Sequence, residues 1–353
     1  MKPNLLNGNS HAKMKVVFFN RKPRALGNIS VESNFKQNRE NLPPNVEAIS
    51  LDMPFESNGI WRRVANAIYC MFHQGDVNHI TGDINYVAIF LIRRKTILTF
   101  LDCGNLHQSK GIKHYLVKLI WYTLPISKSQ HLTAISQATK KDLIHFTDCI
   151  ENKINVIYVS INERFTYHPS SFNTVTPRIL HIGTAPNKNL ERLIPALKDI
   201  RCKLVIVGKI NDQLKELIKL NKIDSECIER RLSDEEILDE YLKCDILSLV
   251  STVEGFGMPI VEANAIGRPV ITSSTTSMPE IANNAAIIVD PLNTNSIRKG
   301  IIQIISQDSI RKILVQNGLT NHLRFQPKVL AIQYVTLYEK ITNTRQLENI
   351  KNE

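Results

Sequence analysis

Residues 247–291 read LSLVSTVEGFGMPIVEANAIGRPVITSSTTSMPEIANNAAIIVDP. An apolar strand pattern ends at Ser251, and Pro259 begins a helix that contains Glu262. The loop between them carries Glu254, Gly255, Phe256 and Gly257. Glycines let a backbone approach a ligand closely, and the amides at a helix N-terminus favour an anion such as a diphosphate. The two glutamates can therefore hold two hydroxyl-bearing parts of one ligand, with an anionic group between them.

Strand-length apolar runs alternate with helical patterns on both sides of this stretch. The predicted strands are 16–19, 46–51, 96–101, 131–135 and 155–159, then 179–182, 203–207, 245–250, 269–272 and 286–289. Strand–helix alternation favours βαβ units and parallel sheets. Two such sets predict an α/β protein with two doubly wound, Rossmann-like domains.

A polar segment with a proline near each end, HPSSFNTVTP at 168–177, separates the two sets of strands. Such composition is typical of a linker. We therefore predict an N-terminal domain over 14–168 and a C-terminal domain over 177–326. A last helical pattern begins at Pro327 and is expected to run over 327–342.

The composition is that of a globular protein, with 43% hydrophobic and 22% charged residues in a chain of 353. The net charge of +11 is uneven, because residues 1–176 hold 21 basic and 12 acidic side chains, a net of +9. A basic half indicates an anionic partner, such as a phosphorylated substrate or an anionic membrane; an ordinary solvated surface is the alternative. No nucleic-acid readout module is recognisable, and no Cys or His set has metal-site spacing.

The stretch 110–126, KGIKHYLVKLIWYTLPI, mixes lysines with aromatic and aliphatic residues. This mixture is typical of a helix that lies at a membrane interface. The alternative is an amphipathic helix that buries Leu116, Ile120 and Trp121 in the core. The N-terminus lacks an apolar signal core, so we expect a cytoplasmic protein or one bound to the cytosolic face of the inner membrane.

The quoted stretch resembles the C-terminal signature of retaining family 4 (group 1) glycosyltransferases of GT-B fold. The similarity extends to RILHIGTAPNKNLERLIPAL at 178–197 and, in the first half, to NHITGD and LTAISQATKKDL. The resemblance implies a cleft between two Rossmann-like domains, with the last helix returning to the first domain. It also implies transfer of a sugar from a nucleotide-sugar donor to a saccharide or lipid-linked acceptor, without metal or other cofactor.

The resemblance assigns roles to named residues. Glu254 would bind hydroxyls of the donor sugar, Glu262 the ribose, and Lys188 the diphosphate. The backbone of the 255–257 loop would line the sugar and phosphate pocket. The remaining candidate residues of the donor site and of catalysis are Gly27, Gly183, Thr184, Lys209, Asp102 and His79.

Two positions depart from the family pattern. Thr184 stands where an arginine is frequent, and Lys209 is then the candidate second cation or simply a surface lysine. Leu101 precedes Asp102 where the family usually has histidine. His79 is expected after a short strand, where it could line the cleft; a structural histidine is the alternative.

The sequence thus predicts a retaining glycosyltransferase of cell-surface polysaccharide or glycolipid synthesis. The alternative is a GT-B subunit that binds nucleotide or saccharide without catalysis, which Leu101 and Thr184 favour.

Overall fold

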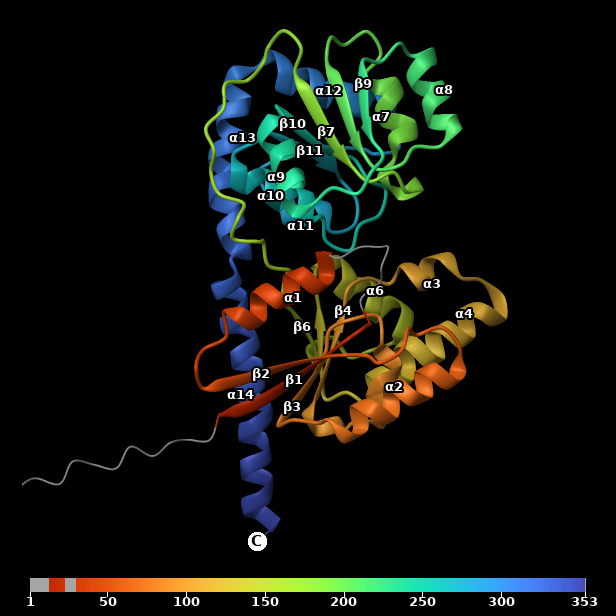
Figure 1. Ribbon diagram of the computed structural model, residues 1–353, viewed down its shortest axis with the longest axis vertical. Helices are drawn as coiled ribbons and strands as arrows, with labels where there is room; N and C mark the ends of the chain where they lie inside the picture. Colours follow the sequence, from red (N-terminus) through yellow and green to blue (C-terminus); the bar gives the residue numbers. More distant parts are fainter. Residues whose placement is uncertain (1–12, 23–29, 353) are drawn as a thin grey trace, which may run out of the picture.

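A computed structural model describes residues 13–22 and 30–352, and it contains two parallel six-stranded sheets (Figure 1). The first sheet has the strand order β2-β1-β3-β4-β5-β6 and the second the order β12-β11-β10-β7-β8-β9. This arrangement confirms the expected α/β class with two doubly wound domains.

The strands of the N-terminal sheet are short and almost wholly buried at the centre. They are β1 (Met14–Asn20), β2 (Val46–Asp52), β3 (Val77–Ile80), β4 (Thr96–Phe100), β5 (His131–Ala134) and β6 (Ile154–Val156). One face is covered by α2 (Ile60–Phe72), α3 (Gly104–Gln108), α4 (Gly111–Val117), α5 (Leu124–Ser127) and α6 (Gln137–Thr147), with 3-10 turns at Asn85–Phe90, Arg93–Lys95 and Glu151–Lys153 and a π-helical turn at Lys118–Thr123. The other face packs against α1 (Ser30–Glu40) and α14 (Pro327–Asn352).

The C-terminal sheet is sandwiched between helices in the same way. Its strands are β7 (Arg178–Ile182), β8 (Lys203–Val207), β9 (Ser225–Ile228), β10 (Ile246–Leu249), β11 (Val270–Ser273) and β12 (Ile287–Val289). Its helices are α7 (Leu190–Ala196), α8 (Asp212–Leu220), α9 (Asp234–Lys243), α10 (Met258–Ile266), α11 (Met278–Ala282), α12 (Thr294–Ser306) and α13 (Asp308–Asn321), with 3-10 turns at Pro186–Lys188 and His322–Phe325. Among the described residues, no helix has the length and apolarity needed to cross a membrane.

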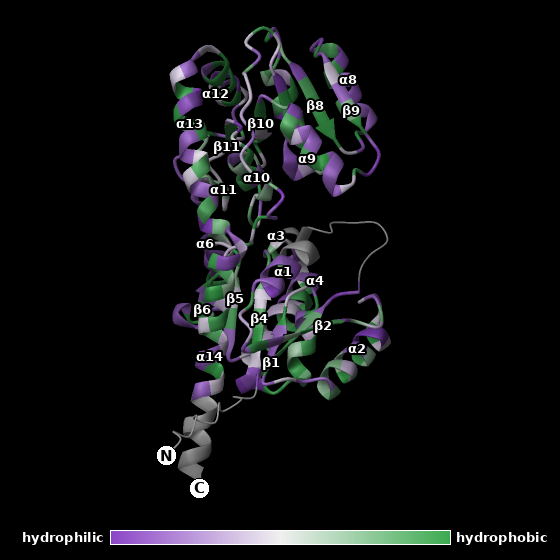
Figure 2. Cartoon of the chain, turned by 60° about the vertical axis from the view of Figure 1, so that its left-hand side comes forward, coloured by the Kyte–Doolittle hydropathy of each residue, from purple (hydrophilic) through white to green (hydrophobic). Residues whose placement is uncertain are grey.

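The chain crosses between the domains earlier than the polar segment 168–177 suggests. Ile157 packs in the N-terminal core, whereas Val159, Ile161 and Phe165 belong to the core around α10. These apolar residues fasten the crossing segment to the C-terminal domain, so the polar stretch that follows runs along that domain. The final helix α14 then leads back along the N-terminal domain, as Figures 1 and 2 show.

His79 lies inside β3, under α14, and does not line the cleft as the sequence suggested. The side chain is fully buried, with Nδ1 2.8 Å from the Tyr338 hydroxyl and Nε2 2.7 Å from Thr99 Oγ1. Burial, and to a lesser degree the charge of Arg39, lowers the pKa of His79 to about 3. A neutral, fully bonded histidine at this position joins the sheet to the returning helix. The cleft position was wrong because His79 lies within a strand and not at its carboxyl end.

The hydrogen bond between His79 Nδ1 and the Tyr338 hydroxyl leads to a stability prediction for Tyr338→Phe. The substitution leaves a buried ring nitrogen of His79 unpaired, which costs about 1–3 kcal/mol. Because Trp61 and Trp121 are the only tryptophans and both lie in the N-terminal domain, urea unfolding followed by tryptophan fluorescence reports on that domain. We expect a lower midpoint for Tyr338→Phe, and a change within about 0.5 kcal/mol for Ile332→Ala at an exposed position of the same helix. Equal midpoints for Tyr338→Phe and wild type would contradict this role of His79.

Candidate functional site

The loop between β10 and α10 ends in a glycine that fixes the start of the helix. Gly257 is the N-cap of α10 and has φ +104, a backbone conformation that favours glycine. The helix begins at Met258, so Pro259 occupies its second position and Glu262 its second turn. Among the described residues, the amides of 255–257 donate no hydrogen bond within the protein. The loop therefore offers free donors next to a helix N-terminus, as an anion requires.

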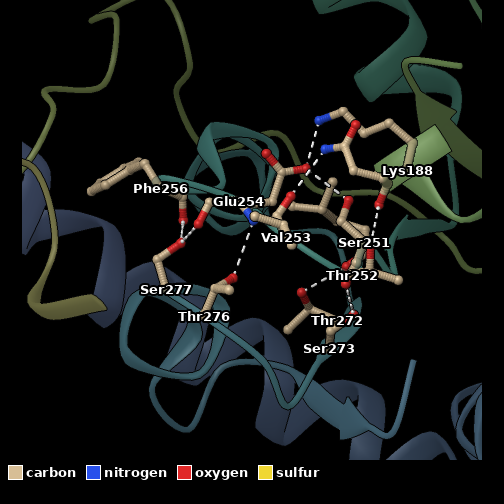
Figure 3. Close-up of polar contacts among 12 residues, drawn as sticks. Lys188, Ser251, Thr252, Val253, Glu254, Phe256, Thr272, Ser273, Thr276 and Ser277 are labelled. Carbon is tan, nitrogen blue, oxygen red and sulfur yellow. Dashed lines mark hydrogen bonds and ion pairs between the residues drawn. The ribbon is translucent and has the colours of Figure 1, made fainter. Parts of the chain in front are cut away.

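Glu254 forms a partly buried ion pair with Lys188, shown in Figure 3. The Lys188 ammonium lies 2.6 Å from Glu254 Oε1, and the Ser251 hydroxyl donates to the same oxygen at 2.7 Å. The backbone amide of Glu254 donates to Thr276 Oγ1, and the Ser277 hydroxyl lies 3.0 Å and 2.8 Å from the carbonyl oxygens of Glu254 and Phe256. The carboxylate is thus held at one oxygen and its backbone is held on both sides, while the second carboxylate oxygen remains available.

Lys188 reaches Glu254 by lying across Gly183. The glycine has φ +96, and a Cβ atom there would lie 3.0 Å from Lys188 Cε. Thr184 packs in the same way against Gly208, where an added Cβ atom would lie 2.9 Å from the Thr184 methyl carbon. Lys209 is exposed, and no contact joins it to Lys188 or Glu254 within the described parts of the chain. The structure therefore brings Gly183 and Lys188 to the site. The role predicted for Lys209, a second cation, stays a prediction.

Asp102 faces the same loop from the N-terminal domain. Its Oδ1 accepts a hydrogen bond from the Gly104 amide at 2.7 Å, and a Cβ atom added to Gly255 would lie 3.1 Å from Asp102 Cβ. Leu101, the residue before it, packs against apolar clusters of both domains. The apolar side chain at this position therefore helps to join the domains. Gly27, the remaining predicted residue of the donor site, lies outside the described residues.

Phe256 turns away from the loop and into the core, so only its backbone can line a pocket. Its ring is 5% exposed and meets Phe325 edge to face, with the ring centroids 5.6 Å apart. It also lies 6.0 Å from the ring of Tyr158, in the segment that joins the domains. The motif therefore carries a core residue between its two glycines, which fixes the backbone of the loop.

Glu262 is anchored by a residue that the sequence did not single out, Tyr241 on α9. The buried Tyr241 hydroxyl donates to Glu262 Oε2 at 2.5 Å. Desolvation raises the pKa of Glu262 to about 7, and the Tyr241 hydrogen bond opposes this shift. A carboxylate that is dehydrated and fixed at one oxygen is suited to accept hydrogen bonds from a ligand at the other. Tyr241 could have been found only from its tertiary position, because DEYLKCD reads as an ordinary helix end.

A second contact across the domains involves Glu280 on α11. Its Oε1 accepts a hydrogen bond from the backbone amide of Gln137, at the N-terminus of α6, at 2.7 Å. A carboxylate is favourable at this end of a helix. Thr139 on the same helix donates to the Gly255 carbonyl oxygen over a long 3.5 Å. The loop 254–257, called the EGFG loop, and α11 thus both touch the N-terminal domain.

The raised pKa of Glu262 predicts a pH-dependent effect of Glu262→Gln. The ordinary glutamate pKa is about 4.3, so the folded protein disfavours ionisation between that value and about 7. The wild type should lose stability as the pH rises through this window, and the glutamine variant should not. We expect the melting temperature of Glu262→Gln, relative to wild type, to rise between pH 4.5 and 7 in calorimetry. Glu216→Gln, at an exposed position of α8, is the control; a pH-independent difference for Glu262→Gln would refute the assignment.

Comparisons with known proteins agree with this geometry. Residues 167–320 match the family model described as glycosyl transferases group 1. An uncharacterized glycosyltransferase of Methanocaldococcus jannaschii is 25% identical over 245 residues, which are 67% of this chain and 68% of that protein. The O-antigen chain mannosyltransferase B of Escherichia coli is 30% identical over 173 residues, 45% of each chain.

Similarity in three dimensions extends over nearly the whole chain. The crystal structure of Anabaena HepE in complex with UDP and glucose superposes with a TM-score of 0.73 at 15% identity, covering 92% of this chain and 99% of that one. The fold is thus GT-B, and the comparisons support group 1 of the glycosyltransferases as the family of the segment that carries Lys188, Glu254 and Glu262.

Proposed function

We propose that the protein is a retaining family 4 glycosyltransferase. It transfers a sugar from a nucleotide-sugar donor to a saccharide or lipid-linked acceptor in cell-surface polysaccharide or glycolipid synthesis. The observation that carries this proposal is the grouping of Lys188, Glu254 and the free amides of 255–257, with Glu262 one helical turn away. Cation, amides and two carboxylates match a diphosphate that lies between a sugar and a ribose.

The chemistry follows from which group meets which part of the donor. The bond between the anomeric carbon and the diphosphate oxygen breaks, and the diphosphate leaves with the electron pair. Lys188 and the loop amides stabilise the charge that develops there, because fixed dipoles and cations need no reorganisation. The acceptor hydroxyl forms the new bond to the anomeric carbon and gives its proton to the leaving phosphate oxygen on the same face. We propose that no metal or cofactor takes part, because Lys188 supplies the cation.

Glu254 has a role that changes with the ligand. Within the protein it compensates the charge of Lys188 over 2.6 Å. A bound diphosphate would compete for the ammonium and leave the carboxylate able to accept more hydrogen bonds from sugar hydroxyls. Ser251 remains bonded to the carboxylate and keeps it in position. We assign Asp102 to the acceptor side of the cleft, where it faces Gly255.

The donor sugar and the cellular site are further parts of the proposal. The Escherichia coli relative is a mannosyltransferase, which supports mannosyl donors as the first to test. We propose that the enzyme works in the cytoplasm, at the cytosolic face of the inner membrane.

The first experiment measures binding. Calorimetric titration with nucleoside diphosphates and with the matching nucleosides should show that Lys188→Ala weakens the diphosphate selectively. Loss of a charged hydrogen bond corresponds to about 1.5–3 kcal/mol, roughly a 10- to 150-fold rise in Kd. Glu262→Ala should weaken both ligands, because the ribose is common to them, and Glu216→Gln should weaken neither. Equal losses for both ligands in Lys188→Ala would remove the diphosphate assignment.

The second experiment measures transfer with a panel of UDP-, GDP- and ADP-sugars and with soluble and lipid-linked acceptors, with and without EDTA. Glu254→Gln should lower kcat more than it raises KM, and proton NMR should show an unchanged anomeric configuration in the product. Inversion would refute the retaining mechanism. Donor binding without transfer to any acceptor would favour the alternative function, a nucleotide- or saccharide-binding subunit, for which Leu101 beside Asp102 is the specific observation.

A further inference from the structure

The outer face of α2 is apolar although it faces solvent. Trp61 is 83% exposed, Phe72 73% and Ile68 43%, and their spacing of seven and four residues places them on one side of the helix. The opposite side carries Asn66 and Cys70, which are fully buried against the sheet. Only a narrow side of the helix therefore packs against the core, and large apolar side chains point into solvent.

Helix α4 repeats this feature. Ile112 is 81% exposed, Tyr115 65% and Leu116 48%, at the i, i+3 and i+4 positions that share one helical face. The sequence allowed Leu116 to be a core residue, but the structure leaves it half exposed. Contiguous exposed apolar side chains on a protein surface mark an interaction site.

The two helices cover the same face of the N-terminal sheet. In a parallel sheet, crossover connections that step the same way across the strands lie on one face. The connection from β2 to β3 contains α2, the connection from β4 to β5 contains α4, and both step from the β2 edge toward the β6 edge. Arg63 of α2 stacks on Trp121, just after α4, with its guanidinium carbon 4.5 Å from the ring centroid. Figure 1 shows both helices on the right-hand side of this sheet. Their exposed apolar residues therefore lie on one side of the N-terminal domain, which we call the α2–α4 face: Trp61, Ile68, Phe72, Ile112, Tyr115 and Leu116.

Charge selects among the occupants of the α2–α4 face. The exposed ionised residues on these helices and directly before α4 are cations, Arg62, Lys110 and Lys113. No acidic residue occurs from 60 to 72 or from 104 to 141. One carboxylate, Glu56 in the loop before α2, reaches Arg62 through Asn58. A second copy of the chain would place these cations against one another, whereas an anionic surface complements them.

We propose that the α2–α4 face docks on an anionic lipid bilayer. Tryptophan and tyrosine beside exposed lysine and arginine suit the headgroup region, where rings meet the acyl boundary and cations meet anionic lipids. This inference deepens the membrane contact in the proposed function and rests on that part of it. Docking by this face would hold the N-terminal side of the cleft near a lipid-linked acceptor.

The test is flotation of the full chain with vesicles of phosphatidylcholine alone or with 30% phosphatidylglycerol. We expect binding to the anionic vesicles that weakens with salt. The variant Trp61→Ser/Phe72→Ser/Ile112→Ser should bind at least tenfold more weakly. Because the three side chains are exposed, its melting temperature should match that of wild type. The control Leu220→Ser removes a 73% exposed leucine from α8 and should bind like wild type.

Fluorescence locates the contact. Brominated phosphatidylglycerol should quench the tryptophan emission of wild type. Trp61→Phe should abolish this quenching, because the one remaining tryptophan, Trp121, packs against the N-terminal core. Equal vesicle binding by the triple variant and wild type would overturn the proposal. Self-association without lipid that is lost in the triple variant would assign the face to a second copy instead. Transfer to a soluble acceptor should be unchanged in the triple variant, so failure of docking and failure of the transferase function are separable.

Discussion

The structure depends on the close approach of the EGFG loop to the end of strand β4. A Cβ atom at Gly255 would lie 2.5 Å from the Leu101 carbonyl oxygen, a distance that backbone atoms do not allow. The missing side chain therefore lets the C-terminal domain touch the N-terminal one at this point. Glu254 and Asp102 are the sequence neighbours of the two residues in contact, Gly255 and Leu101. The Leu101 side chain packs against apolar clusters of both domains at this point. A glycine that the motif supplies for ligand approach also sets the distance between the domains.

Each carboxylate of the site has a partner that fixes it without consuming it. Glu254 is held at one oxygen by Lys188 and Ser251, and Glu262 at one oxygen by Tyr241. At Glu254 short hydrogen bonds from a cation and a hydroxyl compensate a partly buried charge, whereas at Glu262 the single Tyr241 bond only partly opposes the desolvation that raises its pKa. In both cases the other oxygen remains able to accept a hydrogen bond. The two partners differ, because the Lys188 ammonium can bind a diphosphate in place of Glu254, whereas the buried Tyr241 hydroxyl keeps its hydrogen bond to Glu262. The two glutamates are thus suited to different parts of one ligand.

Much of the fold and of the candidate site could be predicted from the sequence, because the local residue pattern and the chemistry of the residues agree. The alternation of strands and helices gave the fold, and the loop at 254–257 lies at the carboxyl end of a strand, where parallel sheets place ligands. The sequence left open whether His79 lines the cleft or is structural, because β3 is only four residues long and its apolar pattern is interrupted by polar residues. Tyr241, Glu280 and the exposure of Trp61 depend on which side of a helix meets another element. Periodicity identifies such a side but does not say what covers it.

We propose that a nucleotide-sugar binds between Lys188 and Glu262. Hydrogen–deuterium exchange of the wild-type chain, with and without a saturating donor or nucleoside diphosphate, tests it most directly because it needs no variant and no acceptor. Binding there slows exchange in 183–188 and 254–262, where Lys188 and the amides of 255–257 lie, and changes exchange little in α8 or α13. Saturating binding that protects other segments and leaves both of these unchanged would contradict it.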